Sequence, residues 1–434
     1  MALRLNSADP GFADDLARLL AARGVGAGEV DRDVAAILED VRARGDDALI
    51  EYTDRFDHLQ LSPATMAIGA DERAAAAEAC PKPALDALDL AAARIEAYHR
   101  RQVPADETYT DDAGVSLGWR WRPVGAAGVY VPGGQAAYPS SVLMNVIPAR
   151  IAGVGRIVMM VPAPWGVINP LVLAAAARAG VTEAYRIGGA QAIAALAFGT
   201  DTITPVDKVV GPGNAWVAAA KRQVFGTVGI DMVAGPSEIL VVADGANDAD
   251  WIAIDLLAQA EHDADAQSIL ITDDRGFADR VEKAVEARLK TLPRAEIAGA
   301  SWAANGAVIV VDDLGEVPAL VDAIAPEHLE LAVENPSPLA DAVTNAGAIF
   351  LGRFTPEAVG DYAAGPNHVL PTGGTARFSS GLSVFDFIKR TSLISCDAAA
   401  LSAVGPAAMI LAQAEGLDAH ALSIAIRLNL PTSE

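Results

Sequence analysis

Two short stretches of the chain carry side chains that could do acid–base chemistry at a substrate. In the first, residues 234–238 (AGPSE), the hydroxyl of Ser237 and the carboxylate of Glu238 come just before the apolar run 239–242. Glycine and proline favour a tight loop, and loops at strand ends are where α/β enzymes bind their substrates. For this loop taken alone, a polar turn without a function is the alternative.

The second stretch is the pair Glu327 and His328, which follows Pro326. A histidine titrates near neutrality and can accept the proton of an alcohol, and a nearby carboxylate can activate water for addition to an aldehyde. We predict that the pair lies at a helix start, where a proline and an acidic residue are ordinary features. That structural role accounts for Glu327 but not for His328.

A third pair could bind a metal ion. Gln259 and His262 are three residues apart in a predicted helix, so their side chains share one face near its C-terminal end. The alternative is a solvated glutamine beside a histidine that complements the helix dipole. The other histidines are at positions 58, 99, 328, 368 and 420. Spacing alone does not bring them together.

Two glycine-containing loops are possible nucleotide-binding sites. Residues 211–214 (GPGN) follow a predicted strand and open a predicted helix, and Asp231 lies eighteen residues beyond Gly213. Trp216 occupies the third glycine position of the Rossmann fingerprint, so the motif fails and a plain turn is the alternative. Residues 130–134 (YVPGG) place the ring of Tyr130 beside loop amides, where it could stack on a nicotinamide or adenine or belong to the core.

The elements that must position these residues alternate between strand and helix. Short apolar runs and helical patterns follow one another through residues 157–225 and again through residues 239–351. This alternation predicts parallel strands joined by crossover helices. We therefore predict an α/β protein with two consecutive doubly wound, incomplete Rossmann-like domains. The predicted segments are a mainly helical N-terminal region (1–105), the two α/β domains (106–236 and 237–375) and a C-terminal segment with a helical tail (376–434).

Composition excludes several classes of protein. The net charge of −24 argues against nucleic acid as a partner, because phosphates require clustered Lys and Arg. The only cysteines are Cys80 and Cys396, and the N-terminus has no apolar signal sequence, so we expect a cytoplasmic protein. Residues 157–177 carry no charge, but prolines at 162, 164 and 170 favour a buried strand, a loop and a helix over a membrane span.

With these motifs in view, the chain resembles the histidinol dehydrogenases over essentially its whole length. The resemblance is carried by residues 231–238 (DMVAGPSE), 325–328 (APEH) and 365–368 (GPNH). It implies that L-histidinol is oxidised through L-histidinal to L-histidine, the last steps of histidine biosynthesis, with two NAD⁺ reduced in succession. No cysteine lies in the matched catalytic segments, which favours a hydrated aldehyde over a thiohemiacetal intermediate.

The resemblance also implies a role for each candidate site residue. His328 would be the base for alcohol oxidation and Glu327 the base for aldehyde hydration. The residues implied to contact NAD are Tyr130, Gln191 and Asn214. Those implied to hold one Zn²⁺ per subunit are Gln259, His262, Asp361 and His420, a nitrogen and oxygen set that would also suit Mn²⁺ or Co²⁺. The substrate would be bound by these four together with Ser237, His328, His368 and Glu415.

The remaining expectations concern the oligomeric state and the substrate. The resemblance implies a homodimer in which Glu415 and His420, on the tail, complete the partner's site. It places NAD in segment 106–236 and the metal and catalytic residues in segment 237–375. One alternative is a related zinc and NAD dehydrogenase acting on another polar alcohol, such as a sulfonated diol. Another is a metal-dependent hydrolase without a cofactor, against which the three matched NAD positions argue.

Overall fold

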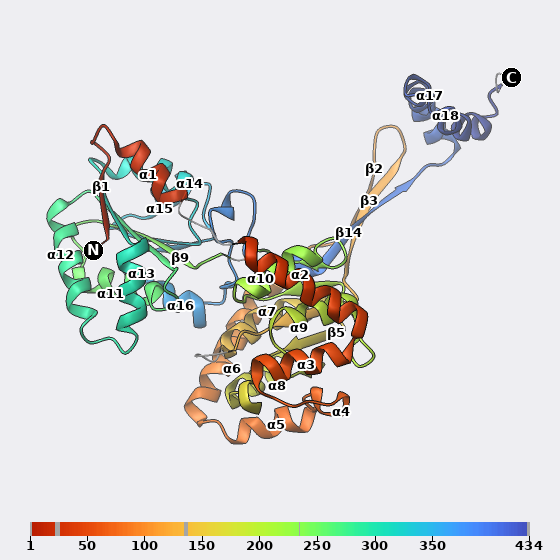
Figure 1. Cartoon of the computed structure of the whole chain (residues 1–434). Helices are drawn as coiled ribbons and strands as arrows, with labels where there is room; N and C mark the ends of the chain where they lie inside the picture. The colour runs from red at the N-terminus through yellow and green to blue at the C-terminus, as the bar shows by residue number, and fades with distance from the viewer. Residues whose placement is uncertain (1, 22–26, 134–137, 234, 432–434) are drawn as a thin grey trace. The chain divides into compact units, whose positions relative to one another are not determined.

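The computed structural model describes residues 2–21, 27–133, 138–233 and 235–431 (Figure 1). Gly134 and Ala234, which belong to two of the motifs above, lie outside these residues. The chain forms two compact units. The first comprises residues 1–102 and 125–387, and the second comprises residues 103–124 and 388–434.

The first unit contains a five-stranded parallel sheet in the order β6-β5-β4-β7-β8. Its strands are β4 (Ala126–Tyr130), β5 (Arg156–Met160), β6 (Glu183–Tyr185), β7 (Lys208–Val210) and β8 (Gly229–Ile230). The helices that follow them are α7 (Pro139–Ala152), η1 (Pro164–Gly166), α8 (Pro170–Ala179), α9 (Gly189–Phe198) and α10 (Ala215–Val224). The strand order reverses between β4 and β7, and ligands of such sheets bind at the carboxyl ends of the strands beside this reversal.

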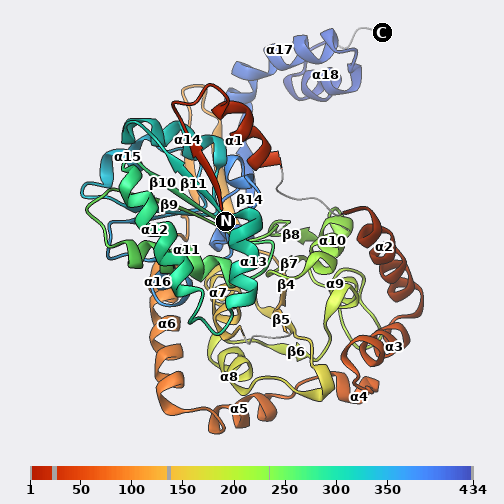
Figure 2. The same ribbon diagram turned by 60° about the vertical axis from the view of Figure 1, so that its left-hand side comes forward.

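Helices from the N-terminal region cover this sheet. They are α2 (Ala27–Arg44), α3 (Asp46–Asp57), α4 (Pro63–Met66), α5 (Ala70–Glu78) and α6 (Lys82–Arg100). Helices α2 and α3 pack on α9 and α10, as Figure 2 shows, and α5 and α6 pack on α7 and α8. The side chains of Ala126 and Tyr130 on β4 belong to the core beneath α2, α9 and α10.

The second parallel sheet of this unit has six strands in the order β1-β11-β10-β9-β12-β13. Its strands are β1 (Leu3–Asn6), β9 (Glu238–Ala243), β10 (Gln267–Thr272), β11 (Ala307–Val310), β12 (His328–Ala332) and β13 (Ala348–Leu351). Its helices are α1 (Phe12–Ala21), α11 (Ala249–Ala260), α12 (Arg275–Arg288), α13 (Ala295–Asn305), η2 (Leu314–Glu316), α14 (Val317–Ile324), α15 (Ser337–Ala342) and α16 (Glu357–Tyr362). Two short 3₁₀-helices follow, η3 (Thr375–Arg377) and η4 (Val384–Phe387).

Helices cover both faces of the six-stranded sheet (Figures 1 and 2). On β9, Ile239 and Val241 face the core under α11, α12 and α13, whereas Leu240 and Val242 face the core under α1 and α14. Because both faces are buried, the strand is a continuous apolar run. The prediction of two consecutive doubly wound domains with a helical N-terminal region is therefore confirmed.

The prediction of a helix start at Glu327 and His328 is wrong. Helix α14 ends at Ile324, and β12 begins at His328. Ala325 caps that helix in the left-handed conformation, with a φ of 48°. Proline is common just after such a cap because it cannot continue the helix, so Pro326 marks the end of one helix and not the start of another.

The second unit is built around an antiparallel sheet in the order β14-β3-β2, which the sequence analysis did not predict. Its strands are β2 (Glu107–Thr110), β3 (Ser116–Pro123) and β14 (Ile388–Ser395). The chain then forms α17 (Ala398–Ala414), α18 (Asp418–Ala425) and the turn η5 (Ile426–Leu428). These last helices confirm the predicted C-terminal helical tail.

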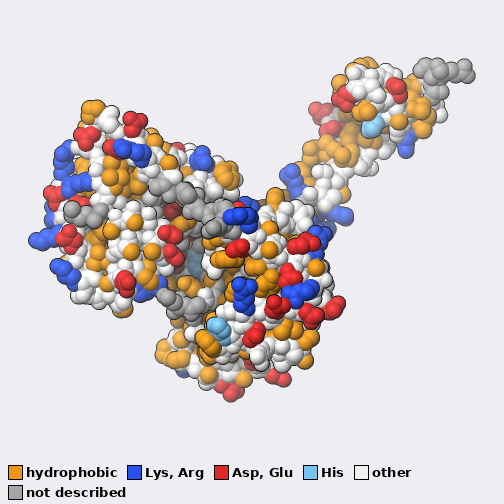
Figure 3. Space-filling model, in the orientation of Figure 1, with side chains coloured by type: hydrophobic (Ala, Val, Ile, Leu, Met, Phe, Trp, Pro, Cys, Tyr) orange, Lys and Arg blue, Asp and Glu red, His pale blue; other side chains and the backbone are white. Residues whose placement is uncertain are grey.

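None of the described helices combines the length and apolar character that crossing a membrane would require. The uncharged stretch 157–177 forms most of β5, a loop with η1 and most of α8, as predicted. On the face of the molecule drawn in Figure 3, acidic and basic side chains are interspersed over the α/β domains.

Candidate active site

A buried histidine at the start of β12 is the centre of the site. His328 is 4% exposed, and its Nδ1 lies 3.0 Å from the backbone carbonyl oxygen of Glu238 on the neighbouring strand β9. A carbonyl oxygen only accepts, so Nδ1 carries the proton of the neutral ring and Nε2 keeps its lone pair. Burial lowers the pKa of His328, which favours this neutral form. No described group forms a hydrogen bond with Nε2.

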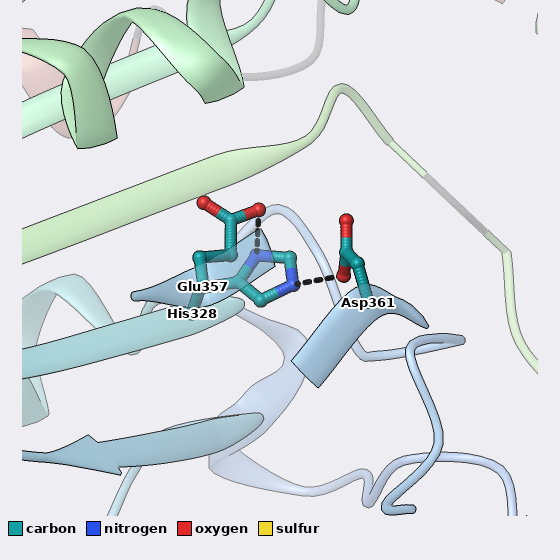
Figure 4. Close-up of side chains that lie close together, drawn as sticks. All are labelled: His328, Glu357 and Asp361. Carbon is teal, nitrogen blue, oxygen red and sulfur yellow. Dashed lines mark ion pairs between the residues drawn. The ribbon is translucent and has the colours of Figure 1, made fainter. Parts of the chain in front are cut away.

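Three carboxyl groups surround this ring, and Figure 4 shows two of them, both from α16. Glu357 Oε1 and Glu327 Oε2 lie 3.6 Å and 3.7 Å from His328 Nδ1, and Asp361 Oδ1 lies 3.7 Å from Nε2. Burial raises the pKa values of Glu327 and Glu357 well above the ordinary range, and the charge of Asp361 adds to this in both cases. These carboxyl groups are therefore stronger bases than solvated ones.

Glu357 is the member of this group that the sequence analysis missed. It begins α16 and is buried, four residues before Asp361 on the same face of the helix. Ligand atoms of Glu357, Asp361 and His328 lie within 4.8 Å of one another, an arrangement that could hold a metal ion. The four-residue spacing from Asp361 was the signal that could have revealed Glu357.

The backbone at the start of β9 is hydrogen-bonded to this cluster, and the loop before β9 is hydrogen-bonded to Thr372. The N–H of Glu238 donates to Glu327 Oε2 at 2.9 Å, and the N–H of Gly235 donates to Thr372 Oγ1 at 2.5 Å. Ser237 thus lies one residue before a backbone group that hydrogen-bonds Glu327. Its own carbonyl accepts from the N–H of Gln267 at 2.9 Å.

Gln259 and His262 are in direct contact, but His262 lies in the turn after α11, which ends at Ala260, and not on the predicted helix. Gln259 lies in the last turn of α11 and is fully buried, and its Nε2 is 3.0 Å from His262 Nδ1. Among the described residues, no group donates a hydrogen bond to Gln259 Oε1. A buried oxygen without a donor beside an imidazole suits a borderline cation, so these two residues fit a bound metal ion.

His368 is oriented by the backbone of α16. Its Nδ1 lies 2.9 Å from the carbonyl oxygen of Asp361, and its Nε2 lies 3.5 Å from Ser141 Oγ. Burial lowers the pKa of His368, while the charge of Asp361 acts in the opposite direction. The charges of His262 and His368 add to the effect of burial in lowering the pKa of His328.

A separate cavity of about 420 Å³ lies in the five-stranded domain. Its lining includes the three residues matched to NAD positions, Tyr130, Gln191 and Asn214. The Tyr130 hydroxyl accepts from the N–H of Gly189 at 3.1 Å, and burial raises the pKa of Tyr130 to about 12, so the phenol stays neutral. Gln191 Oε1 is buried and accepts no hydrogen bond from a described group. The N-terminal helices also line the cavity, through Asp57 among others, which the sequence analysis did not foresee.

The remaining two predicted residues belong to the second unit. Glu415 caps the C-terminal end of α17 and His420 lies in α18, and both are exposed. All the other predicted site residues belong to the first unit.

Comparison with known proteins identifies the family of the chain. The sequence model of the family described as histidinol dehydrogenase matches residues 22–428. The histidinol dehydrogenase of Rhodospirillum rubrum is 66% identical over 431 residues, and that of Rhizobium meliloti is 61% identical over 430 residues; each alignment covers 99% of both chains. The crystal structure of histidinol dehydrogenase from Elizabethkingia anophelis matches with a TM-score of 0.94 and 38% identity, over 99% of this chain and 98% of that one. These matches do not favour a dehydrogenase of another polar alcohol. The chain belongs to the histidinol dehydrogenase family and is an NAD-dependent oxidoreductase of histidine biosynthesis.

Proposed function

We propose that His328 and Glu327 divide the two oxidations of L-histidinol between them. The observation that carries this proposal is the state of His328, whose Nδ1 proton is held by the Glu238 carbonyl and whose Nε2 lone pair has no hydrogen-bond donor among the described residues. In the first oxidation, Nε2 accepts the hydroxyl proton while the carbon-bound hydrogen leaves as hydride. NAD⁺ accepts that hydride when bound.

The second oxidation requires water. Glu327 removes a proton from a water molecule as its oxygen adds to the carbonyl carbon of histidinal, and His328 returns the proton it accepted in the first oxidation to the carbonyl oxygen, giving the hydrated aldehyde and a neutral His328. The hydrate then loses a hydride to a second NAD⁺ and a proton to His328, leaving the carboxylic acid. The raised pKa of Glu327 makes its carboxylate a strong base for the hydration step, and its backbone contact with Glu238 holds one of its oxygens in place.

The metal ligands in this proposal are Gln259, His262, Asp361 and His420, with Zn²⁺ as the ion. Gln259 and His262 are supported as ligands because the side-chain oxygen of Gln259, beside His262, accepts no hydrogen bond from a described residue. Asp361 is supported because its carboxylate lies near His328. When bound, the ion would hold the imidazole and amine of the substrate, so that the hydroxymethyl end faces His328. Ser237, His368 and Glu415 complete the set of substrate contacts.

We assign NAD to segment 106–236, in the cavity lined by Tyr130, Gln191 and Asn214. Segment 237–375 carries the metal and the acid–base groups, and segment 376–434 crosses to the partner in a homodimer. Exposed apolar side chains on the tail support this crossing, with Ile410, Leu411 and Ile426 exposed by 66%, 64% and 56%. Both cysteines are free thiols, which is consistent with a cytoplasmic location.

The substrate assignment is tested by following NADH formation with L-histidinol and with amino alcohols that lack the imidazole. We expect two NADH per histidinol consumed and L-histidine as the product. Turnover of a sulfonated diol at a comparable rate would contradict the assignment of the metal to the imidazole and amine.

The shared site is tested by mixing two inactive variants. Asp361→Ala removes a ligand from the first unit and His420→Ala removes one from the tail, so each homodimer is expected to be inactive. If the tail serves the partner, a mixed dimer has one site with both defects and one intact site. Random reassembly should then restore about a quarter of wild-type activity. No recovery, with subunit exchange verified by tagged chains, would assign the tail to its own subunit.

A further inference from the structure

Asp231 lies at the distance from the glycine loop at which a Rossmann fingerprint has its ribose-binding acid, but its carboxylate does something else. It forms a buried ion pair with Lys221 of α10, whose side chain is 3% exposed, while that of Asp231 is fully buried. Asp231 is not among the described residues that line the NAD cavity. The pair therefore needs a role other than direct contact with the ribose.

The two members of the pair form hydrogen bonds with the backbone of Gly211, Asp231 with its N–H and Lys221 with its carbonyl oxygen. The N–H of Gly211 donates to Asp231 Oδ2 at 2.8 Å, and Lys221 Nζ donates to the Gly211 carbonyl oxygen at 2.9 Å. The other carboxylate oxygen, Oδ1, accepts from the N–H of Met232 at 2.7 Å. The backbone of Gly211 is thus held at both its donor and its acceptor.

Gly211 occupies a place where no side chain fits. Its φ is 110°, and a Cβ there would lie 2.2 Å from the carbonyl oxygen of Tyr130. Tyr130 ends β4, Gly211 follows β7 and Asp231 follows β8, so the three meet at the carboxyl ends of adjacent strands. Three residues after Gly211, Asn214 caps α10 by accepting from the N–H groups of Trp216 and Val217, both at 3.2 Å.

We infer that Lys221 and Asp231 are positioning residues for the cofactor, which fix the Gly211 peptide and through it the place of Asn214 beside Tyr130. The inference rests on the proposed NAD site. Lys221 lies on the helix that Asn214 opens, so the ion pair ties the loop before this helix to the helix itself. Without the pair, the loop would have to become ordered when the dinucleotide binds. The free-energy cost of that ordering would weaken the binding of the dinucleotide.

The test is the dissociation constant of NADH, measured by fluorescence titration without any turnover. Lys221→Met is expected to weaken NADH binding by about tenfold, because the Gly211 carbonyl loses its donor and the loop its anchor. The double variant Lys221→Met with Asp231→Asn leaves no uncompensated buried charge, so it should fold even where the single variant does not. It should show the same weakening.

Val224→Ala is the matched control. Val224 is buried at the far end of the same helix, and none of the hydrogen bonds described above involves it. It should lower the melting temperature and leave NADH binding unchanged. Wild-type NADH affinity in the double variant would overturn the inference and leave the pair as an element of stability. Asn214→Ala separates this from the proposed site itself: unchanged affinity there would mean that the cofactor binds elsewhere.

Discussion

Glu327→Gln is expected to slow the oxidation of histidinal to histidine by about 10²–10⁴-fold, the usual cost of losing a general base. The amide keeps the shape of the side chain, and its oxygen can still accept from the Glu238 N–H, but it cannot take a proton from water. Hydride exchange between histidinol and histidinal requires no water, so it should keep most of its rate. The two half-reactions can be measured separately, by NADH formation from histidinal and by isotope exchange.

Glu330→Gln provides the control for this change. Glu330 lies on the same strand as His328 and is also buried, and burial raises its pKa to about 9. The substitution is chemically identical, but Glu330 has no assigned part in either half-reaction, so both rates should stay near wild type. Equal losses of both half-reactions in Glu327→Gln would show that Glu327 and His328 do not have separate roles.

Removal of the metal ion is expected to abolish turnover while the fold stays largely intact. The proposed ligands Gln259 and Asp361 come from separate helices of a domain with its own large apolar cores, so the ion is not needed to assemble that domain. Chelator-treated protein should keep its circular dichroism spectrum, and added Zn²⁺ should restore NADH formation.

Cofactor binding gives an internal control for the same experiment. The described residues that line the proposed NAD cavity include none of the proposed metal ligands, so metal-free protein should still bind NADH. Full activity in protein shown by elemental analysis to contain no metal would remove the ion from the mechanism. Loss of NADH binding together with the metal would mean that the two sites are coupled.

Local patterns in the sequence were sufficient for the parallel sheets and for part of the site. Apolar runs such as residues 348–351 coincide with a strand, and the side chains of Gln259 and His262, which were predicted to lie together, are in contact although the helix ends before His262. The neighbours of His328 come from another strand and another helix, and local periodicity says nothing about such pairings. For the same reason β1 was not expected to join β11 at the edge of the second sheet.

Prediction also failed where a residue type fits two structural roles. Pro326 suits the end of a helix as well as its start, and only the left-handed Ala325 decides between them. Asp231 has the spacing of a ribose ligand, yet it is paired with Lys221, which is ten residues away in sequence and whose side-chain direction depends on the packing of α10.

The antiparallel pairing of β3 with β14 has a consequence for how the chain matures. Ser116 is paired with Ser395 and Pro123 with Ile388, so the two strands lie far apart in the sequence. During synthesis β2 can cover one edge of β3 early, but the other edge stays open until almost the whole polypeptide has left the ribosome. The sheet of the second unit therefore cannot be completed before β14 has been synthesised. A nascent chain that stalls before residue 388 would carry an unpaired strand edge, which is a template for aggregation.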